Sequence, residues 1–87
     1  MRICKNEQVI ENYFSFNMTS SHNGNLFTRY NYNGEWELVN YSTPLVRYAN
    51  GVYYINTKKY SVTTSKIQTY INRYINNNFT NEQVEEM

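Results

Sequence analysis

The 87-residue sequence predicts an α+β fold: an antiparallel β-meander of four to five strands with one C-terminal α-helix packed on a face. Asn-Gly pairs favour the tight turns of β-hairpins, and the chain carries three of them, at positions 23–24, 33–34 and 50–51. Residues around these turns alternate between apolar and polar, as strands do. Near the C-terminus the apolar residues recur at helical spacing instead.

The segment before the first turn fits two patterns. Apolar residues at positions 9, 10, 13 and 14 have the spacing of a short amphipathic helix. Residues 13–19 also alternate like a strand, with Phe14, Phe16 and Met18 on one face. We prefer the strand because aromatic residues favour sheets and a turn sequence follows. A helix or a strand over residues 5–14 remains open.

Two hairpins follow. Residues 25–32 and 35–39 alternate on either side of the second Asn-Gly pair, which predicts a pair of antiparallel strands. Residues 45–49 and 52–55 flank the third pair and predict another. Pro44 stands at the head of its strand, where a missing N–H costs little.

The C-terminal helix is predicted by an apolar stripe at i, i+3, i+4, i+7 and i+8, formed by Ile67, Tyr70, Ile71, Tyr74 and Ile75. Ser65 followed by Gln68 matches a capping box, and Thr63 or Thr64 could equally be the cap. We expect one compact domain over residues 1–79. Residues 80–87 are then an acidic, flexible C-terminal tail unless Phe79 and Val84 hold it to the domain.

Charge is unevenly distributed along the chain. All seven acidic residues are glutamates, and none lies between positions 38 and 81. The same interval contains the basic residues Arg47, Lys58, Lys59, Lys66 and Arg73. Such an asymmetry predicts an acidic or polyanionic partner.

Ten tyrosines account for most of the aromatic content, and Arg-Tyr pairs recur at positions 29–30, 47–48 and 73–74. In one interpretation these tyrosines lie in the sheet or core beside an exposed arginine. In the other, arginines and tyrosines on one sheet face form a stacking platform for bases or for a partner's side chains. The residues assigned to that platform are Arg29, Tyr30, Tyr48, Tyr53 and Tyr60.

The sequence offers little for catalysis. It has no aspartate, one histidine and one cysteine, and Cys4 with His22 cannot form a zinc cluster. Glu35 and Glu37 share a strand face beside a turn, where we expect them to be wet. We therefore predict no enzyme activity, no metal site and no cofactor, and leave the roles of Cys4 and His22 open. No signal peptide or membrane segment is recognisable, so we expect a cytoplasmic protein.

The segment "NYSTPLVRYANGVYYINTKKYSVTTSKIQTYI" resembles a family of small, uncharacterised phage and prophage domains. Their signature Tyr-Ser-x-Thr-Thr-Ser-Lys/Arg-x-Gln leads into a helix. The matching residues here are Tyr41, Thr43, Gly51, Tyr60, Ser61, Thr63, Thr64, Ser65, Lys66 and Gln68. The family often has histidine before the glutamine, where this chain has Ile67. The resemblance covers about residues 26–76 and implies phage origin, with no established biochemistry.

Together these features predict a binding module that inhibits a host protein or nucleoprotein in the bacterial cytosol, such as a defence complex, as anti-CRISPR proteins do. The alternative is direct binding of DNA or RNA by a basic, tyrosine-rich surface. The expected partner or phosphate contacts are Arg47, Lys58, Lys59, Thr63, Thr64, Ser65, Lys66 and Arg73. The hydroxyl cluster is either a helix start or an anion site. A homodimer through an uncovered sheet face is a further alternative.

Overall fold

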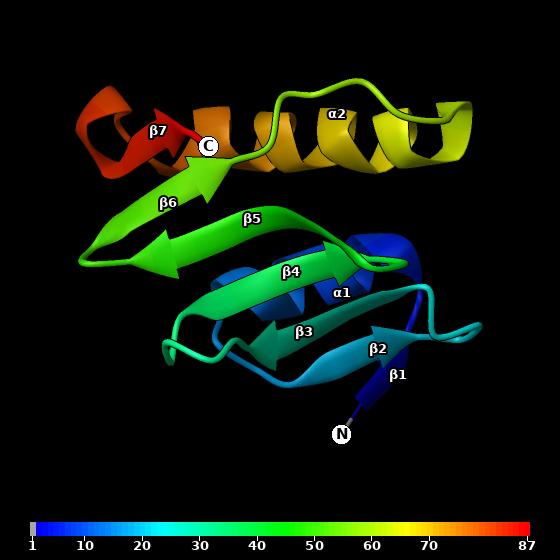
Figure 1. Cartoon of the computed structure of the whole chain (residues 1–87). Helices are drawn as coiled ribbons and strands as arrows, with labels where there is room; N and C mark the ends of the chain where they lie inside the picture. The colour runs from blue at the N-terminus through cyan, green and yellow to red at the C-terminus, as the bar shows by residue number, and fades with distance from the viewer. Residues whose placement is uncertain (1) are drawn as a thin grey trace.

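The computed structural model describes residues 2–87, with side chains from Cys4 onward. These residues form a seven-stranded sheet whose strands lie in the same order in space as along the chain (Figure 1). The strands are β1 (Arg2–Cys4), β2 (Thr19–Ser21), β3 (Leu26–Tyr30), β4 (Trp36–Asn40), β5 (Thr43–Ala49), β6 (Val52–Ile55) and β7 (Val84–Glu86).

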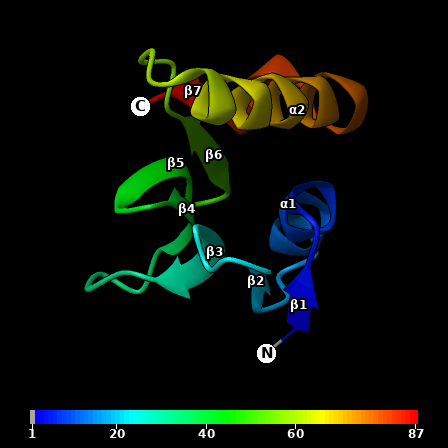
Figure 2. The same cartoon turned by 90° about the vertical axis from the view of Figure 1, so that its right-hand side faces the viewer.

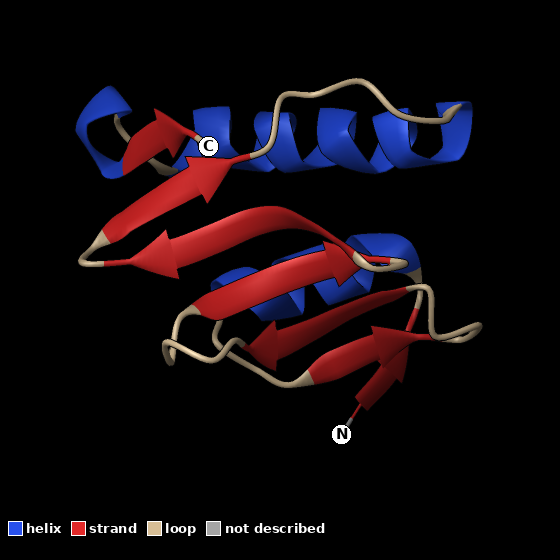
Figure 3. Ribbon diagram, in the orientation of Figure 1, coloured by secondary structure: helices blue, strands red, loops and turns tan. Residues whose placement is uncertain are grey.

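Two α-helices, α1 (Asn6–Phe14) and α2 (Val62–Asn78), pack on the same face of the sheet (Figures 2 and 3). A short 3-10 turn, η1 (Asn81–Gln83), follows α2. Buried side chains from both helices and from the facing side of the sheet make one continuous core. Neither of these helices packs on the opposite face of the sheet, which we call the uncovered face.

Strands β2 to β6 pair antiparallel, whereas β1 pairs parallel with β2 and β6 pairs parallel with β7. Parallel neighbours need a crossover, and α1 and α2 provide one at each edge of the sheet. The predicted α+β class, the mostly antiparallel sheet and the C-terminal helix are confirmed. The predicted number of strands was too low. The prediction also lacked helix α1 and both parallel strand pairs.

The strand preferred for residues 13–19 is wrong, because residues 6–14 form α1. The helical stripe at positions 9, 10, 13 and 14 is buried against the sheet. Phe16 and Met18, placed on the same strand face as Phe14, are instead half exposed beyond the end of the helix. The helix forms because it buries the side chains at all four of these helical positions at once.

Residues 80–87 do not extend from the domain. Val84–Glu86 form β7 beside β6, and the N–H of Met87 donates to the carbonyl of Ile55 at 2.8 Å. Phe79 and Val84 pack against the core, and the hydroxyl of Thr57 donates to the carboxylate of Glu86. The sequence predicted a flexible tail unless Phe79 and Val84 hold it to the domain, and both residues do contact the core.

Each of the three Asn-Gly pairs lies between antiparallel neighbours, in β2–β3, β3–β4 and β5–β6. Only the turn between β5 and β6 has positive φ at both central residues, with Asn50 at 54° and Gly51 at 80°. This is the type I′ geometry that suits a two-residue loop. At the other two Asn-Gly pairs only the glycine has a positive φ.

The centre of the core is a pair of aromatic residues from α1 and β4. The rings of Tyr13 and Trp36 stack with centroids 5.6 Å apart and planes 1° from parallel. The Tyr13 hydroxyl donates to the Trp36 carbonyl at 2.9 Å, and the Trp36 indole N–H donates to the Tyr13 carbonyl at 2.8 Å. Burial and the neighbouring Tyr53 raise the pKa of the Tyr13 hydroxyl far above its ordinary value. The pair fixes α1 on the sheet.

Candidate binding site on helix α2

The hydroxyl cluster at the start of α2 is mainly a capping structure. Ser61 is the N-cap, and its side chain accepts a hydrogen bond from the backbone N–H of Thr64 at 3.3 Å. The prediction of a cap at Ser65, Thr63 or Thr64 is therefore wrong. Thr64 is buried, and its hydroxyl donates to Oδ1 of Asn40 on β4 at 2.7 Å. Thr64 joins the helix start to the sheet and does not face a ligand.

The variant Thr64→Val keeps the shape of this side chain but removes the donor to Asn40. We expect the free energy of unfolding to fall by about 1–2 kcal/mol, since a buried acceptor loses its hydrogen bond. Thr63→Val is the matched control because Thr63 is exposed. Urea unfolding of both variants measures the difference. Equal stabilities would show that the Thr64 contact does not fix the helix start.

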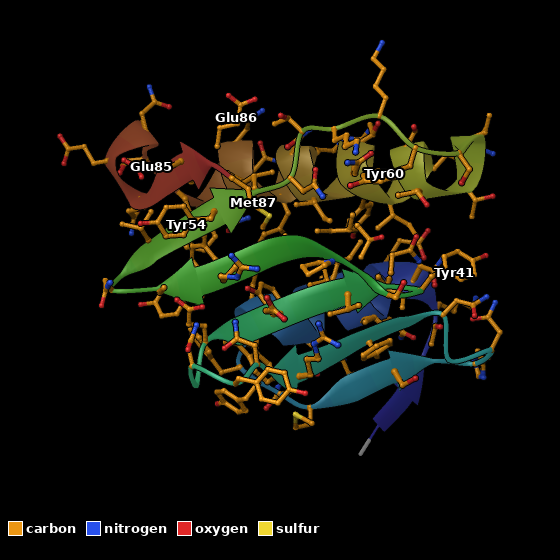
Figure 4. All side chains as sticks on the ribbon, viewed as in Figure 1. Tyr41, Tyr54, Tyr60, Glu85, Glu86 and Met87 are labelled. Carbon is orange, nitrogen blue, oxygen red and sulfur yellow. The ribbon has the colours of Figure 1, made fainter. Side chains whose placement is uncertain are left out.

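Gln68 holds the loop of residues 56–61 along α2. Its side-chain amide donates to the carbonyls of Asn56 at 3.0 Å and Lys58 at 2.9 Å. The amide of Asn56 donates in turn to the carbonyl of Pro44 and to the hydroxyl of Tyr60, both at 3.0 Å. Figure 4 shows Tyr60 on this loop, in front of the helix. The loop therefore brings Lys58, Lys59 and Tyr60 to the surface of α2.

A groove of about 460 Å³ runs along the outer side of α2. Its lining residues are Tyr60, Val62, Ser65, Lys66, Thr69, Tyr70 and Arg73. Val62 is 75% exposed, which is unusual for an aliphatic side chain in the first turn of a helix. A smaller hollow of about 190 Å³ lies between the two helices and shares Lys66 and Tyr70 with the groove.

The cations of this surface are not neutralised. Within the part of the chain that the structure describes, Lys58, Lys59, Lys66 and Arg73 form no ion pair. The Lys58 ammonium lies 6.0 Å from the centroid of the Tyr60 ring, at the outer limit of a cation–π contact. We name the α2 site the groove together with four cations: Lys66 and Arg73, which line it, and Lys58 and Lys59 on the adjoining loop.

Helix α1 brings acidic groups to this surface that the local sequence did not reveal. The Tyr70 hydroxyl donates to Glu11 at 3.2 Å, and Glu7 lines the smaller hollow beside Lys66. Burial of the Tyr70 hydroxyl and its hydrogen bond to Glu11 raise its pKa above the ordinary value. The side of the α2 site that meets α1 therefore carries glutamates as well as Lys66.

Arg47 lies elsewhere, on the uncovered face of the sheet. Its Nε is 2.9 Å from Glu37 Oε2, and the Nε of Arg29 is 3.1 Å from Glu37 Oε1. Asn31 also donates to Glu37 at 3.3 Å, and Glu35 lies 3.7 Å from Arg47. The prediction that Arg47 belongs with the α2 cations is wrong, since β5 directs it to the opposite face.

Glu37 itself was expected to be wet, and it is only 1% exposed. Burial alone would raise the pKa of its carboxyl group. The hydrogen bonds from Arg47, Arg29 and Asn31 outweigh this effect and hold the pKa below its ordinary value. Glu37 is thus a charged structural residue beneath two arginines, and its carboxylate oxygens are already engaged.

The residues assigned to a stacking platform do not form one surface. Tyr53 is buried in the core, where burial and the nearby Tyr48 raise the pKa of its hydroxyl to about 12. Tyr48 packs on Tyr53 with ring centroids 4.6 Å apart. Tyr30 is exposed at the far end of β3, and Tyr60 belongs to the α2 site. The platform prediction is wrong for Tyr48 and Tyr53 because their strand positions face the helices.

Among residues 2–87 no group of three or more histidine, cysteine or acidic side chains is placed to hold a metal ion. Within the same range, neither helix is both long and apolar enough to cross a membrane. Cys4 is buried, and its sulfur accepts hydrogen bonds from Asn12 and Thr19. Comparisons with protein-family models, with curated proteins and with solved structures found no match to this chain.

Proposed function

We propose that the protein is a non-catalytic binding module whose α2 site docks on an acidic surface of a host protein or nucleoprotein. One observation carries this proposal: Lys66 and Arg73 line a partly apolar groove, the loop beside it carries Lys58 and Lys59, and none of the four forms an ion pair among the described residues. Cations without internal partners keep their full attraction for an incoming acidic group.

The lining of the groove favours a protein over bare nucleic acid. Val62, Tyr60 and Tyr70 offer apolar and aromatic area of the kind found at the centre of protein interfaces. Glu7 and Glu11 lie at the α1 side of the same surface, where they would repel a continuous phosphate backbone. An acidic patch or helix of a protein can present its charge to one side of the groove only.

We infer the biological role of this docking from the resemblance to phage domains. Small phage proteins of this size commonly act by occupying a surface of a host defence complex, and we propose inhibition of such a complex in the cytosol, in the manner of an anti-CRISPR protein. A rigid surface suits this role because little conformational entropy is lost on binding. Here Gln68 and Ser61 fix the loop and helix start that carry the cations.

Reversing three charges of the α2 site tests the proposal. The triple variant Lys58→Glu, Lys59→Glu, Lys66→Glu is expected to weaken partner binding by about a hundredfold, since several exposed charges act together. The matched control replaces the same lysines with arginine and should bind nearly as well. The partner is first captured from host lysate with and without nuclease, and its affinity is then measured by calorimetry. Unchanged affinity of the glutamate variant would exclude the α2 site.

Direct binding of DNA or RNA is the second candidate, favoured by the absence of ion pairs at the same four cations. It predicts capture that nuclease abolishes and an affinity that falls steeply as salt is raised. Docking on a protein predicts capture that survives nuclease and a shallower dependence on salt. Failure to retain single-stranded or double-stranded DNA or RNA at low salt would exclude the second candidate.

A further inference from the structure

Helix α1 ends in a way that its sequence does not favour. The N–H of Phe16 donates to the carbonyl of Tyr13 at 3.1 Å, and the N–H of Asn17 donates to that of Asn12 at 2.9 Å. These two bonds form a Schellman motif, and they require a left-handed residue at position 16. Phe16 adopts it, with φ of 59°. Glycine usually takes this position, because a side chain there costs about 1–2 kcal/mol.

The side chain of Phe16 is only partly used by the fold. Its ring meets Tyr48 edge-on at 5.3 Å and lies 6.3 Å from the ring of Trp36. The residue is nevertheless 50% exposed. Glycine at this position would remove the backbone strain and would lose only these two ring contacts. Local folding therefore gives a weak reason for phenylalanine here.

Phe16 is one of four large exposed side chains gathered beyond the end of α1. Tyr30 packs on Trp36 with ring centroids 4.8 Å apart and is 60% exposed. Met18 is 48% exposed, and its sulfur accepts a hydrogen bond from Thr28, two residues before Tyr30 on β3. Tyr32 is fully exposed and lines, with Tyr30, a hollow of about 310 Å³. We name Phe16, Met18, Tyr30 and Tyr32 the aromatic end.

Charge at the aromatic end is balanced. Arg29 lines the hollow with Tyr30 and Tyr32, and it belongs to a group of paired charges that also contains Arg47, Glu35 and Glu37. Two positive and two negative groups leave no net attraction for a polyanion such as nucleic acid. Asn31 lines the same hollow. An apolar centre with a polar rim of no net charge is the composition of a protein contact.

The size of the aromatic end indicates what covers it. With about 200 Å² for a fully exposed aromatic side chain, the exposed parts of these four side chains amount to about 500 Å². A stable homodimer needs about 800 Å² from each partner. The cluster is too small to hold a second copy by itself. It is large enough to be the centre of a contact with one segment of another protein.

We propose that the aromatic end is a second docking site, which takes an uncharged, apolar segment of a protein partner and uses Phe16 as its anchor. It lies at the opposite end of α1 from the hollow that α1 shares with the α2 site. It recognises different chemistry and does not depend on the cations of that site. The Schellman motif fixes the backbone of Phe16, and its ring contacts Tyr48 and Trp36, so binding of a partner there costs little entropy.

A random-peptide display selection on the wild-type protein tests the proposal, with the methyl group of Met18 as an NMR probe. We expect the selected peptides to be uncharged and apolar and to shift the Met18 methyl signal. Their affinity for Phe16→Gly should be at least about tenfold lower than for the wild-type protein. Glycine suits the left-handed position, so Phe16→Gly should fold. Phe16→Asn is a second variant, because asparagine also tolerates the left-handed conformation. Lys66→Glu is the control and should bind these peptides unchanged, which separates this site from the α2 site.

Three results would overturn the proposal. The first is a selection with no peptide that depends on Phe16, or with charged peptides only. The second is a dimer seen in sedimentation of the wild-type protein and lost in Phe16→Gly, because a second copy would then be the occupant. The third is a shift of the Met18 signal by oligothymidylate, because the aromatic end would then stack on bases.

Discussion

The variant Trp36→Ala is expected to lose most of its stability and to be partly unfolded at room temperature. Removing a buried tryptophan costs about 3–5 kcal/mol, and a domain of 87 residues has a total stability of only about 5 kcal/mol. The variant also loses the ring stacked on Tyr13 and leaves the Tyr13 carbonyl without its indole donor. Far-UV circular dichroism and urea unfolding measure the folded fraction.

Tyr13→Phe is the matched variant for the same contact. It keeps the aromatic ring of α1 but removes the hydroxyl that donates to the Trp36 carbonyl. A loss of about 1–2 kcal/mol is expected, and the protein should stay folded. If Trp36→Ala unfolds at nearly the wild-type urea concentration, the stacked pair does not hold α1 on the sheet. If Trp36→Ala loses much more stability than Tyr13→Phe, packing of the rings contributes more than the hydrogen bond of the Tyr13 hydroxyl.

The hairpins and α2 could be predicted because their signals are local. Each predicted strand pair flanks an Asn-Gly turn, so the residues that pair lie close in sequence. In α2 the stripe at Ile67, Ile71 and Ile75 is buried as its spacing indicates. No partner from another part of the chain had to be known for either prediction.

Helix α1 and strand β7 could not be predicted in this way. Residues 13–18 carry a strand pattern and part of a helix pattern at once, and the helix forms because it buries four side chains against the rest of the chain, Tyr13 on Trp36 among them. Strand β7 has three residues and no alternation long enough to recognise. It exists because Phe79 and Val84 reach the core and place Val84–Glu86 beside β6.

In the candidate sites, too, contacts between residues close in sequence could be predicted and contacts between distant residues could not. Arg29 lies opposite Glu37 across the β3–β4 hairpin, and the position of the Asn-Gly turn already implies that register. The prediction of a wet Glu37 neglected these cross-strand neighbours. Tyr70 and Glu11 meet across 59 positions of sequence, so no local pattern could reveal that α1 places acid beside the α2 site.

Replacing both Arg29 and Arg47 with leucine is expected to lower the free energy of unfolding by about 3 kcal/mol at neutral pH. The buried Glu37 carboxylate would then keep only the hydrogen bond from Asn31. An uncompensated buried charge typically costs 3–5 kcal/mol, and we expect about the lower value because both arginines are partly exposed to water.

The pH dependence of stability identifies Glu37 as the cause. In the wild-type protein its pKa is depressed, so its contribution is full above the ordinary value of 4.5 and is lost as pH falls through the folded-state pKa. In the double leucine variant burial should raise that pKa, and acidification toward 4.5 should then recover stability. Adding Glu37→Gln to the double variant should restore stability at neutral pH, because a neutral amide costs less to bury. Urea unfolding over this range of pH measures all three proteins. A double variant that loses stability on acidification as the wild type does would show that the two arginines are not what keeps Glu37 charged.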